Sequence, residues 1–482
     1  DKNMNLEAVI GLEIHAELKS KTKIFCSCST KFGAKPNENT CPICTGVPGT
    51  LPVLNEEVVN LAIKAGTALG CKINKFNKMD RKNYFYPDLP KNYQTSQFDI
   101  PICSGGTVEY DYEGKHVKVR LNRIHIEEDA GKLVHVEGEP ISLIDYNRVG
   151  VPLAEIVTEP DMRSVGEAVE FLRILKSILE YSEVSDCRME QGSLRCDANI
   201  SLRPVGSQEY GTKVELKNIN SFRELEKALK KEEKRQRELI SFNEGHKIVQ
   251  ETRRWDAAKG KTISMRSKEQ AHDYRYVVEP DLPPIIIYDN QIEEIRKSLP
   301  EMPDEKRERF LNEYKLSEKE VEILISDIVL SRFFESVVKE GITPKMGANW
   351  ILGDILRILN EKKLDTDQMP LNAENFAKLL KVVNEGKISN NIGREVLDEI
   401  FDENKDPMKI IEEKGLMQIS STDELEKLID EVIAANPQSV EDYKAGKTQS
   451  AGFLMGQVMK KSQGKANPKV CKELIDEKLS KL

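Results

Sequence analysis

The chain has 482 residues, of which 39% are hydrophobic and 32% charged, so it is long enough for two to four domains with well-filled cores. The formal net charge of -9 argues against a surface of broad positive potential, so any nucleic-acid contact has to use local basic patches. No apolar run approaches the ~18–20 residues of a membrane span, and the first residues lack the basic-then-apolar pattern of an export signal. We therefore expect a cytoplasmic protein that does not enter a membrane.

The first predicted element is a strand over residues 9–18, VIGLEIHAEL. Its apolar residues alternate with Glu13, His15 and Glu17, and side chains two residues apart in a strand point the same way. Glu13 and His15 are therefore neighbours on one face. Two interpretations remain for this strand alone: a polar face in contact with water, or a pair of ligands for Mg²⁺ or Mn²⁺.

Four of the nine cysteines follow as two close pairs, Cys26 with Cys28 and Cys41 with Cys44, joined by a short polar loop. Such spacing is typical of a structural zinc site, in which each pair sits on a tight turn. Because all four ligands would be cysteine, no coordination position stays open for catalysis. A disulfide framework is the alternative, but nothing indicates secretion.

A helix is predicted over residues 55–69, followed by an unusual stretch over residues 80–97, DRKNYFYPDLPKNYQTSQ. Arg81, Lys82 and Lys91 could bind phosphates there, and the tyrosines could stack on bases. A Pro-rich loop whose aromatic rings fill a core crevice is equally compatible with the pattern. The sequence contains no G-x-x-x-x-G-K-[ST] phosphate loop, so an ATP site would have to be built differently.

Residues 117–131, VKVRLNRIHIEEDAG, begin as an alternating strand whose phase slips at Arg123, which predicts a β-bulge. The strand ends in three consecutive acids, Glu127, Glu128 and Asp129. Alone, such a run favours a solvated turn over a cation site. Glu155, however, lies in an otherwise apolar run at 145–160, where a carboxylate has to be paired or metal-bound. Three segments with inward acids or a histidine favour a metal-centred site.

A helix over 167–181, strands over 192–204 and 211–222 and a charged helix over 225–239 complete the strand-rich part. The polar faces of these two strands suit either solvent or a bound polyanion. The Pro-rich segment 279–288 predicts a domain boundary, and beyond it only helical patterns occur. One such helix opens at Ser317 and is predicted to run through Ile328.

The predicted fold class is α+β, with a mixed or antiparallel sheet in residues 1–290, a helical domain in 291–408 and a helical tail domain in 409–482. The densest basic patch of the tail follows a small-and-apolar helix face and contains Lys460, Lys461 and Lys465. Basic patches are usually plain surface, but one at a helix end beside a glycine turn is a fair phosphate contact.

Long stretches of the chain resemble the GatB/GatE family of tRNA-dependent amidotransferase subunits. They include VIGLEIHAEL, RKNYFYPDLPKNYQTSQF, RIHIEEDAGK, VPLAEIVTEPD, GSLRCDANISLRP and GQVMKKSQGKANP, and they run from residue 9 to about 470. The resemblance implies an N-terminal cradle domain over 1–290 with the zinc knuckle at 26–44, then a helical domain and a tRNA-binding tail.

The resemblance also implies a reaction. Glutamate mischarged on tRNA(Gln), or aspartate on tRNA(Asn), is phosphorylated by ATP on its side-chain carboxylate. Ammonia, released from glutamine by the amidase (A) component, then displaces the phosphate, and a small C component joins A and B in a heterotrimer. This sequence contains neither a Ser-Ser-Lys amidase signature nor a catalytic cysteine with a partnered histidine, in keeping with an outside source of ammonia.

Transferred to this sequence, the Mg²⁺ ligands and catalytic residues of the family fall on His15, Glu128 and Glu155. Glu13 and Glu127 adjoin them and are expected to bind Mg²⁺ through water. Arg81, Lys82 and Lys91 are expected to contact the phosphates of ATP or to line the path of ammonia. The cysteine quartet occurs in only part of the family, so zinc cannot carry the chemistry.

A second hypothesis belongs to another class of function. In it, the chain is a zinc-containing tRNA-binding module that presents charged tRNA to a separate enzyme, and its acids are structural. ATP hydrolysis that depends on Mg²⁺ and on misacylated tRNA distinguishes the two hypotheses.

Overall fold

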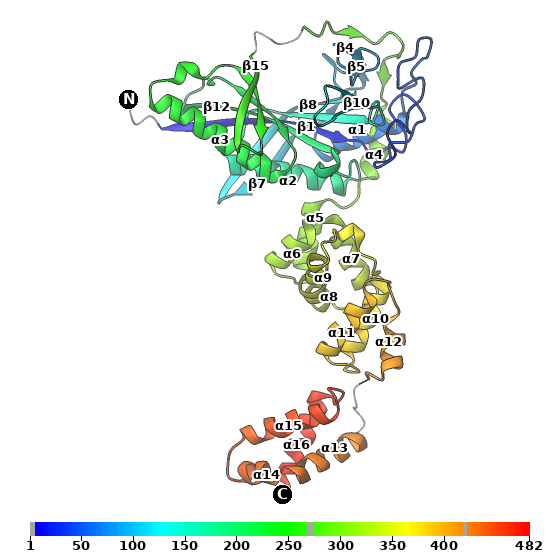
Figure 1. Ribbon diagram of the computed structural model, residues 1–482, viewed down its shortest axis with the longest axis vertical. Helices are drawn as coiled ribbons and strands as arrows, with labels where there is room; N and C mark the ends of the chain where they lie inside the picture. The colour runs from blue at the N-terminus through cyan, green and yellow to red at the C-terminus, as the bar shows by residue number, and fades with distance from the viewer. Residues whose placement is uncertain (1–4, 268–272, 418–421) are drawn as a thin grey trace. The chain divides into compact units, whose positions relative to one another are not determined.

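The computed structural model describes residues 5–267, 273–417 and 422–482, and the chain divides into two compact units, Asp1–Pro303 and Asp304–Leu482 (Figure 1). The first unit is built on a ten-stranded sheet with the order β15-β14-β13-β12-β1-β11-β8-β6-β2, and β7 pairs with β8 outside that path. Among the described strands of this sheet, only β13 and β14 run parallel. The mixed sheet and the helical second unit confirm the predicted α+β class.

The ten strands are β1 (Leu6–Glu17), β2 (Lys72–Ile73), β6 (Cys103–Ser104), β7 (Thr107–Tyr112), β8 (Lys115–Glu128), β11 (Pro152–Thr158), β12 (Leu194–Pro204), β13 (Val214–Ile219), β14 (Glu251–Asp256) and β15 (Lys261–Ser267). Three smaller sheets pair β9 (Lys132–His135) with β10 (Ser142–Asp145), β4 (Asp80–Asn83) with β5 (Tyr93–Ser96) and β16 (Val277–Val278), and β3 (Phe76–Asn77) with β17 (Ile285–Ile286). The helices of the first unit are α1 (Glu56–Ala68), α2 (Val165–Tyr181), α3 (Phe222–Ser241) and α4 (Asp289–Lys297), with 3₁₀ turns at Met189–Gln191 and Gly245–Lys247.

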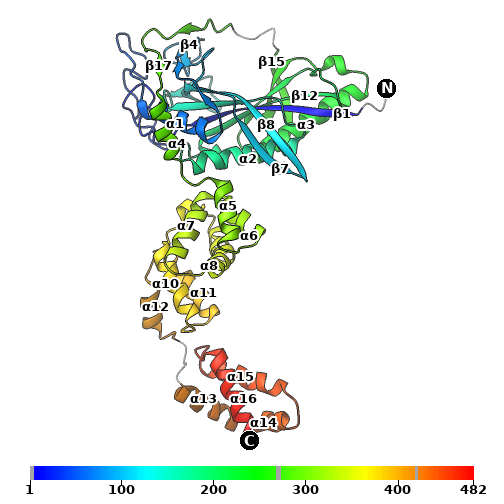
Figure 2. The ribbon, with the colours of Figure 1, turned by 180° about the vertical axis from the view of Figure 1, so that it is seen from behind.

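The centre of the sheet is β1, whose alternation separates two environments. Ile10, Leu12 and Ile14 are buried in a core that also contains residues of α1, α2 and α3, whereas Glu13 and His15 lie on the opposite face. Figures 1 and 2 show α2 and α3 along one face of the sheet. Because apolar burial fixes the register of each strand, the polar side chains gather on the other face.

The predicted bulge in β8 is confirmed within one residue. Val157 of β11 pairs with Arg123, but its neighbour Thr158 pairs with Leu121, so Asn122 is the extra residue. Ile124 and Ile126 then continue the buried face that Val117, Val119 and Leu121 begin. The bulge turns the end of β8 so that its acids lie inside the molecule.

Side-chain caps define where the predicted helices of the first unit begin. Asn55, Ser164 and Ser221 accept hydrogen bonds from backbone N–H groups in the first turns of α1, α2 and α3. The helices predicted over 55–69, 167–181 and 225–239 are confirmed, although α3 is longer at both ends.

The second unit contains helices and their connections throughout its described residues. These are α5 (Pro303–Asn312), α6 (Glu318–Ile325), α7 (Ile328–Lys339), α8 (Pro344–Trp350), a π-helical turn (Ile351–Ile355), α9 (Leu356–Glu361), a 3₁₀ turn (Thr366–Gln368), α10 (Ala373–Asn384), α11 (Asn390–Ile400), α12 (Pro407–Lys414), α13 (Thr422–Ala435), α14 (Pro437–Lys444), α15 (Gln449–Lys461) and α16 (Pro468–Ser480).

One helix prediction in this unit is wrong. The helix that opens at Ser317 ends at Ile325, and α7 begins at Ile328. The break occurs because the Asp327 side chain accepts hydrogen bonds from the N–H groups of Val329 and Leu330, which makes it the cap of a new helix.

The predicted domain limits at residues 290 and 408 stay predictions, but the packing of the helices near them can be described. Most of helix α4 follows residue 290, the predicted end of the first domain. Its residues Ile292 and Ile295 nevertheless pack against the core of the first unit. Helices α13 to α16 share a core of their own, with Leu425, Leu454 and Ile475 among its residues. Within the described part of the chain, no helix has the length and apolar character needed to cross a bilayer.

Candidate functional site

A row of three side chains crosses the polar face of the sheet. His15 on β1 pairs in register with Glu155 on β11, and Glu155 pairs with His125 on β8. Directly paired residues on adjacent antiparallel strands point to the same face. The sheet therefore places two imidazoles on either side of one carboxylate.

Glu127 lies beside this row and, with His15 and Glu155, forms a compact group of possible metal ligands. His15 Nε2 lies 3.0 Å from Glu127 Oε1 and 3.4 Å from Glu155 Oε2. Donor atoms about 2.1 Å from an octahedral ion are about 3.0 Å apart, so the spacing fits a small divalent cation. His15, Glu127 and Glu155 form one of three groups within the described residues that could hold a metal ion.

His125 has a different relation to the group. Its Nε2 lies 2.7 Å from Glu155 Oε2 and 3.3 Å from Glu127 Oε2, while Arg123 Nε donates a hydrogen bond to its Nδ1 at 3.3 Å. Burial would lower the pKa of His125, but the two carboxylates raise it to about 9. The hydrogen bond from Arg123 favours an unprotonated Nδ1, whereas the two carboxylates favour the imidazolium. In both forms the Nε2–H faces the carboxylates and orients them.

The electrostatics of the group favour charged carboxylates. Burial alone would raise the pKa of both Glu127 and Glu155, and repulsion from Glu155 would raise that of Glu127 further. The histidines more than offset this, so the pKa of Glu127 falls to about 2 and that of Glu155 falls well below its usual value. Two ionised carboxylates, one buried and one half-buried, that both lie against His15 and His125 are suitable ligands for a hard cation.

The three consecutive acids at the end of β8 have three different partners. Glu127 joins the histidines, the Glu128 carboxylate accepts a hydrogen bond from Lys91 Nζ at 2.7 Å, and Asp129 accepts one from Arg195 at 2.7 Å. All three are buried, so the interpretation of this run as a solvated turn is wrong. The structure therefore separates Glu128 from the His15 group, and its role as a Mg²⁺ ligand stays a prediction.

Replacing Lys91 with methionine should destabilise the first unit by about 3 kcal/mol, because Glu128 is left as a buried charge without its partner. Adding Glu128→Gln to this variant should restore much of the stability. Chemical denaturation of both variants measures the effect, and Lys72→Met at an exposed lysine is the control. Equal stability of Lys91→Met and the control would contradict the pairing.

Glu13 belongs to a second acidic group. It pairs in register with Asp197 on β12, and together with Glu215 on β13 these residues form another set that could hold a cation. Burial raises the pKa of Glu13, and repulsion from Glu155, Glu215 and Asp197 raises it further. The predicted role of Glu13 as a water-mediated ligand of the first group stays a prediction.

The three cations predicted to bind phosphate have distinct surroundings. Arg81 makes a two-pronged contact with Glu279, at 2.8 and 3.1 Å, and lines a cleft of about 220 Å³ together with Lys91 and Glu128. Lys82 lies over the ring of Tyr274 at 4.4 Å and makes no ion pair within the described residues. Their contact with phosphates stays a prediction, and Lys82 is the one of the three that no described carboxylate holds.

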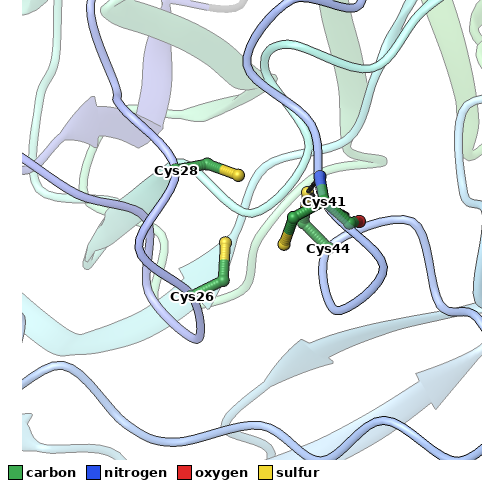
Figure 3. A group of neighbouring side chains, drawn as sticks. All are labelled: Cys26, Cys28, Cys41 and Cys44. Atoms are coloured by element: carbon green, nitrogen blue, oxygen red, sulfur yellow. Dashed lines mark hydrogen bonds between the residues drawn. The ribbon is translucent and has the colours of Figure 1, made fainter.

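The cysteine quartet borders the same cleft. Figure 3 shows Cys26 and Cys28 on one loop facing Cys41 and Cys44 on another, and the four sulfurs form a group that could hold a metal ion (Figure 3). Cys44 Sγ accepts hydrogen bonds from the Cys41 N–H at 3.3 Å and from Lys23 Nζ at 3.5 Å.

Cys44 is the member of the quartet whose surroundings favour the thiolate, whereas its hydrogen bond with Cys26 raises the pKa of Cys26 and burial raises the pKa of Cys28 to about 11. A hydrogen bond from Cys26 lowers the pKa of Cys44 to about 4. Lys23 is fully buried and brings a positive charge beside the sulfurs. Thiolates are the form of cysteine that binds metal, so the donor set fits a structural ion.

The tail lysines lie at the end of α15. Lys460 and Lys461 occupy its last turn, and Lys461 Nζ pairs with Glu431 of α13 at 2.5 Å. Lys465 lies just beyond, after the left-handed residues Gln463 and Gly464. Their contact with tRNA stays a prediction.

Three residues of these groups are not predicted from the sequence as ligands or positioning groups: His125, Asp197 and Glu215. His125 precedes Glu127 by two residues on a predicted strand, so strand geometry alone places both on one face. Asp197 and Glu215 lie on the predicted polar faces of β12 and β13, but no sequence pattern indicates that β12 pairs with β1 and β13 with β12.

Comparison with known proteins identifies the family of this chain. Residues 8–293 match the GatB/GatE catalytic domain, and residues 332–479 match the GatB domain. The chain belongs to the GatB/GatE family. Every side chain of the two acidic groups, the cleft and the cysteine quartet lies in the part that matches the GatB/GatE catalytic domain, and the tail lysines lie in the part that matches the GatB domain.

Close relatives of this GatB/GatE family member cover its whole length. It is 83% identical over 479 residues to the B subunit of the aspartyl/glutamyl-tRNA(Asn/Gln) amidotransferase of Clostridium beijerinckii, with 99% of this chain and 100% of the relative covered. It is 63% identical to a B subunit, numbered 2, of Clostridium acetobutylicum and 57% identical to the B subunit of Thermoanaerobacter pseudethanolicus, with the same coverage.

Proposed function

We propose that this chain is the B subunit of an aspartyl/glutamyl-tRNA(Asn/Gln) amidotransferase, and that its first unit activates the side-chain carboxylate of misacylated Glu-tRNA(Gln) or Asp-tRNA(Asn) with ATP. The observation that carries the proposal is the convergence of His15, Glu127 and Glu155 on the polar face of the sheet, within the segment that matches the GatB/GatE catalytic domain. The whole-length identity to relatives that carry this name supports it.

The chemistry explains why phosphorylation comes first. A carboxylate is a poor acyl electrophile. Attack of one carboxylate oxygen on the γ-phosphorus of ATP breaks the bond to ADP and forms an acyl phosphate. Ammonia then attacks the acyl carbon, the bond between carbon and the bridging oxygen breaks, and phosphate leaves with that oxygen to give the amide.

Phosphoryl transfer requires mainly positioning and positive charge from a protein. His15, Glu127 and Glu155 would hold Mg²⁺, which supplies charge for the phosphates when bound. Lys82 is suited to an anionic phosphate because no described carboxylate holds it. Arg81 and Lys91 are held by Glu279 and Glu128, so a role in phosphate binding or in the path of ammonia requires these pairs to exchange partners.

The ammonia is proposed to come from an amidase, the A component of the complex, with a small C component completing a heterotrimer. The absence of an amide-hydrolysing signature from the sequence supports an outside source. Cys26, Cys28, Cys41 and Cys44 are proposed to hold one structural Zn²⁺. Because the proposed substrates are charged tRNAs, we propose that the protein works in the cytoplasm.

The alternative is a zinc-containing module that only presents charged tRNA to another enzyme. The test is ATP cleavage by the complex reconstituted with the amidase. The proposal predicts that ATP cleavage requires both Mg²⁺ and misacylated tRNA. Cleavage that is absent, or that is indifferent to the charged tRNA, would favour the binding module.

The tail offers a separate prediction. Replacing Lys460, Lys461 and Lys465 with alanine should weaken binding of charged tRNA and flatten the salt dependence by about 0.7–0.9 for each phosphate that is no longer bound. Turnover at saturating tRNA should change little, because the acids proposed to act in catalysis lie in the first unit. Unchanged affinity and salt slope would mean that the patch is ordinary solvated surface.

A further inference from the structure

A basic cleft lies at the edge of the large sheet, apart from the groups described above. It has a volume of about 460 Å³ and is formed by α3 together with β14 and β15. Its charged lining residues are Lys231, Lys234, Arg235, Arg253, Lys261 and a single carboxylate, Glu238. The cleft therefore has a local excess of positive charge on a chain whose net charge is -9, which indicates a site for an anionic ligand.

The floor of the cleft is a fixed charge network. Glu232 is fully buried, and its carboxylate accepts hydrogen bonds from Arg235 at 2.7 Å and from Thr262 Oγ1 at 3.0 Å. Arg253 binds the neighbouring Glu251 at 2.7 Å. These carboxylates hold the two guanidinium groups in place, so the floor is rigid and close to electrically balanced.

The rim of the cleft is not balanced. Lys231, Lys234 and Lys261 are exposed. Within the described residues, the only ion pair of these three lysines joins Lys234 to Glu238 at 3.9 Å, between side chains that are both more than half exposed. Lys231 and Lys234 are three residues apart on α3 and so share a face, where like charges repel. The rim therefore has cationic charge that internal carboxylates do not neutralise, which suits an anionic ligand.

The cleft and the His15 group lie on opposite faces of the sheet. Arg253 pairs in register with Leu216, which belongs to the buried face covered by helices, whereas Glu215 beside it belongs to the second acidic group on the polar face. A ligand in the cleft therefore cannot touch the acids proposed to act in catalysis. Its contacts can position a large substrate without taking part in the reaction.

We propose that this cleft binds the phosphate backbone of the tRNA substrate. The proposal rests on the proposed function, in which tRNA is the substrate. In it, the cleft holds the body of the RNA while the aminoacyl end reaches the polar face of the sheet. Three flexible lysines on the rim of an open cleft suit successive backbone phosphates, which they can neutralise without reading the sequence. The volume exceeds that needed for a single free phosphate, and the exposed rim leaves room for a continuous strand.

The test uses the reconstituted complex with Lys231, Lys234 and Lys261 all replaced by alanine. The matched control replaces Lys72, Lys115 and Lys118, which are exposed lysines elsewhere in the first unit, so both variants lose the same charge. Fluorescence anisotropy with misacylated tRNA over a range of salt concentrations gives affinity and salt slope. Steady-state amidation gives KM for charged tRNA and kcat.

The cleft variant should bind tRNA about tenfold or more weakly at about 0.1 M salt, with a salt slope lower by roughly 2–3 units, and should raise KM with little change in kcat. The control should stay within about twofold of wild type. Equal weakening in both variants would mean that only net charge matters, and unchanged binding would mean that the cleft does not contact tRNA; either result overturns the proposal. A wild-type complex that binds tRNA but never consumes ATP would instead refute the proposed function.

Discussion

The Glu155→Gln variant is expected to lose amide formation on charged tRNA by at least about 100-fold, because a residue at the centre of a proposed ion site loses its charge. Glu155 lies between His15 and His125, at 3.4 and 2.7 Å, so glutamine keeps the shape but not the anion that both imidazoles face. Glutamine hydrolysis by the amidase should stay measurable, since that reaction takes place on another chain.

Parallel assays of amidation and glutamine hydrolysis in the reconstituted complex measure this effect. Glu137→Gln, at an exposed residue of the same unit, is the control and should leave both activities unchanged. Amidation at the wild-type rate in Glu155→Gln would show that the group formed by His15, Glu127 and Glu155 does not take part in the reaction.

The second large effect concerns the cysteine quartet. Cys44→Ser should remove about one metal ion per chain and lower the melting temperature by on the order of 5–10 °C, because metal binding stabilises the two loops that carry the sulfurs. Cys44 is the most buried of the four and accepts hydrogen bonds from the Cys41 N–H and Lys23. Loss of this sulfur also leaves the Lys23 charge buried beside a weaker acceptor.

Elemental analysis and thermal unfolding of purified protein test this expectation. Cys71→Ser is the matched control, because Cys71 lies outside the quartet and its thiol donates to the Gly105 carbonyl. A wild-type protein without zinc, purified in the absence of chelators, would refute the assignment, as would four cysteines joined in disulfides.

The apolar positions of the sequence predict the faces of the sheet well. Ile10, Leu12 and Ile14 in β1, and Ile124 and Ile126 in β8, lie in the core as their alternation predicts. The phase slip at Arg123 predicts the bulge. Burial of apolar side chains is decided locally by the period of the strand, so a single sequence carries this information.

The partners of the polar side chains could not be predicted in the same way. Glu127, Glu128 and Asp129 are adjacent in the sequence, yet they contact His15, Lys91 and Arg195, which come from three other segments. Pairing of this kind depends on which strands are neighbours and in what register. The local pattern determines neither, which is why it favours a solvated turn for three acids that are in fact buried.

The family resemblance provides candidates that the local pattern does not, but it does not distinguish adjacent residues. It implies Glu128 as a ligand of the ion and Glu127 beside it, whereas the structure brings Glu127 to His15 and pairs Glu128 with Lys91. A shift of one residue along a strand reverses the face on which a side chain lies. Variants at both positions therefore separate the two assignments.

The central claim is that the side-chain carboxylate of the tRNA-bound amino acid is activated by phosphorylation. The most direct measurement uses glutamate whose side-chain carboxylate carries ¹⁸O at both oxygens, charged onto tRNA and converted to the amide by the reconstituted complex with ATP and glutamine. We predict one ¹⁸O atom in each phosphate released, because the bridging oxygen leaves with phosphorus. Amide formed together with unlabelled phosphate, or with the label in AMP, would contradict the claim.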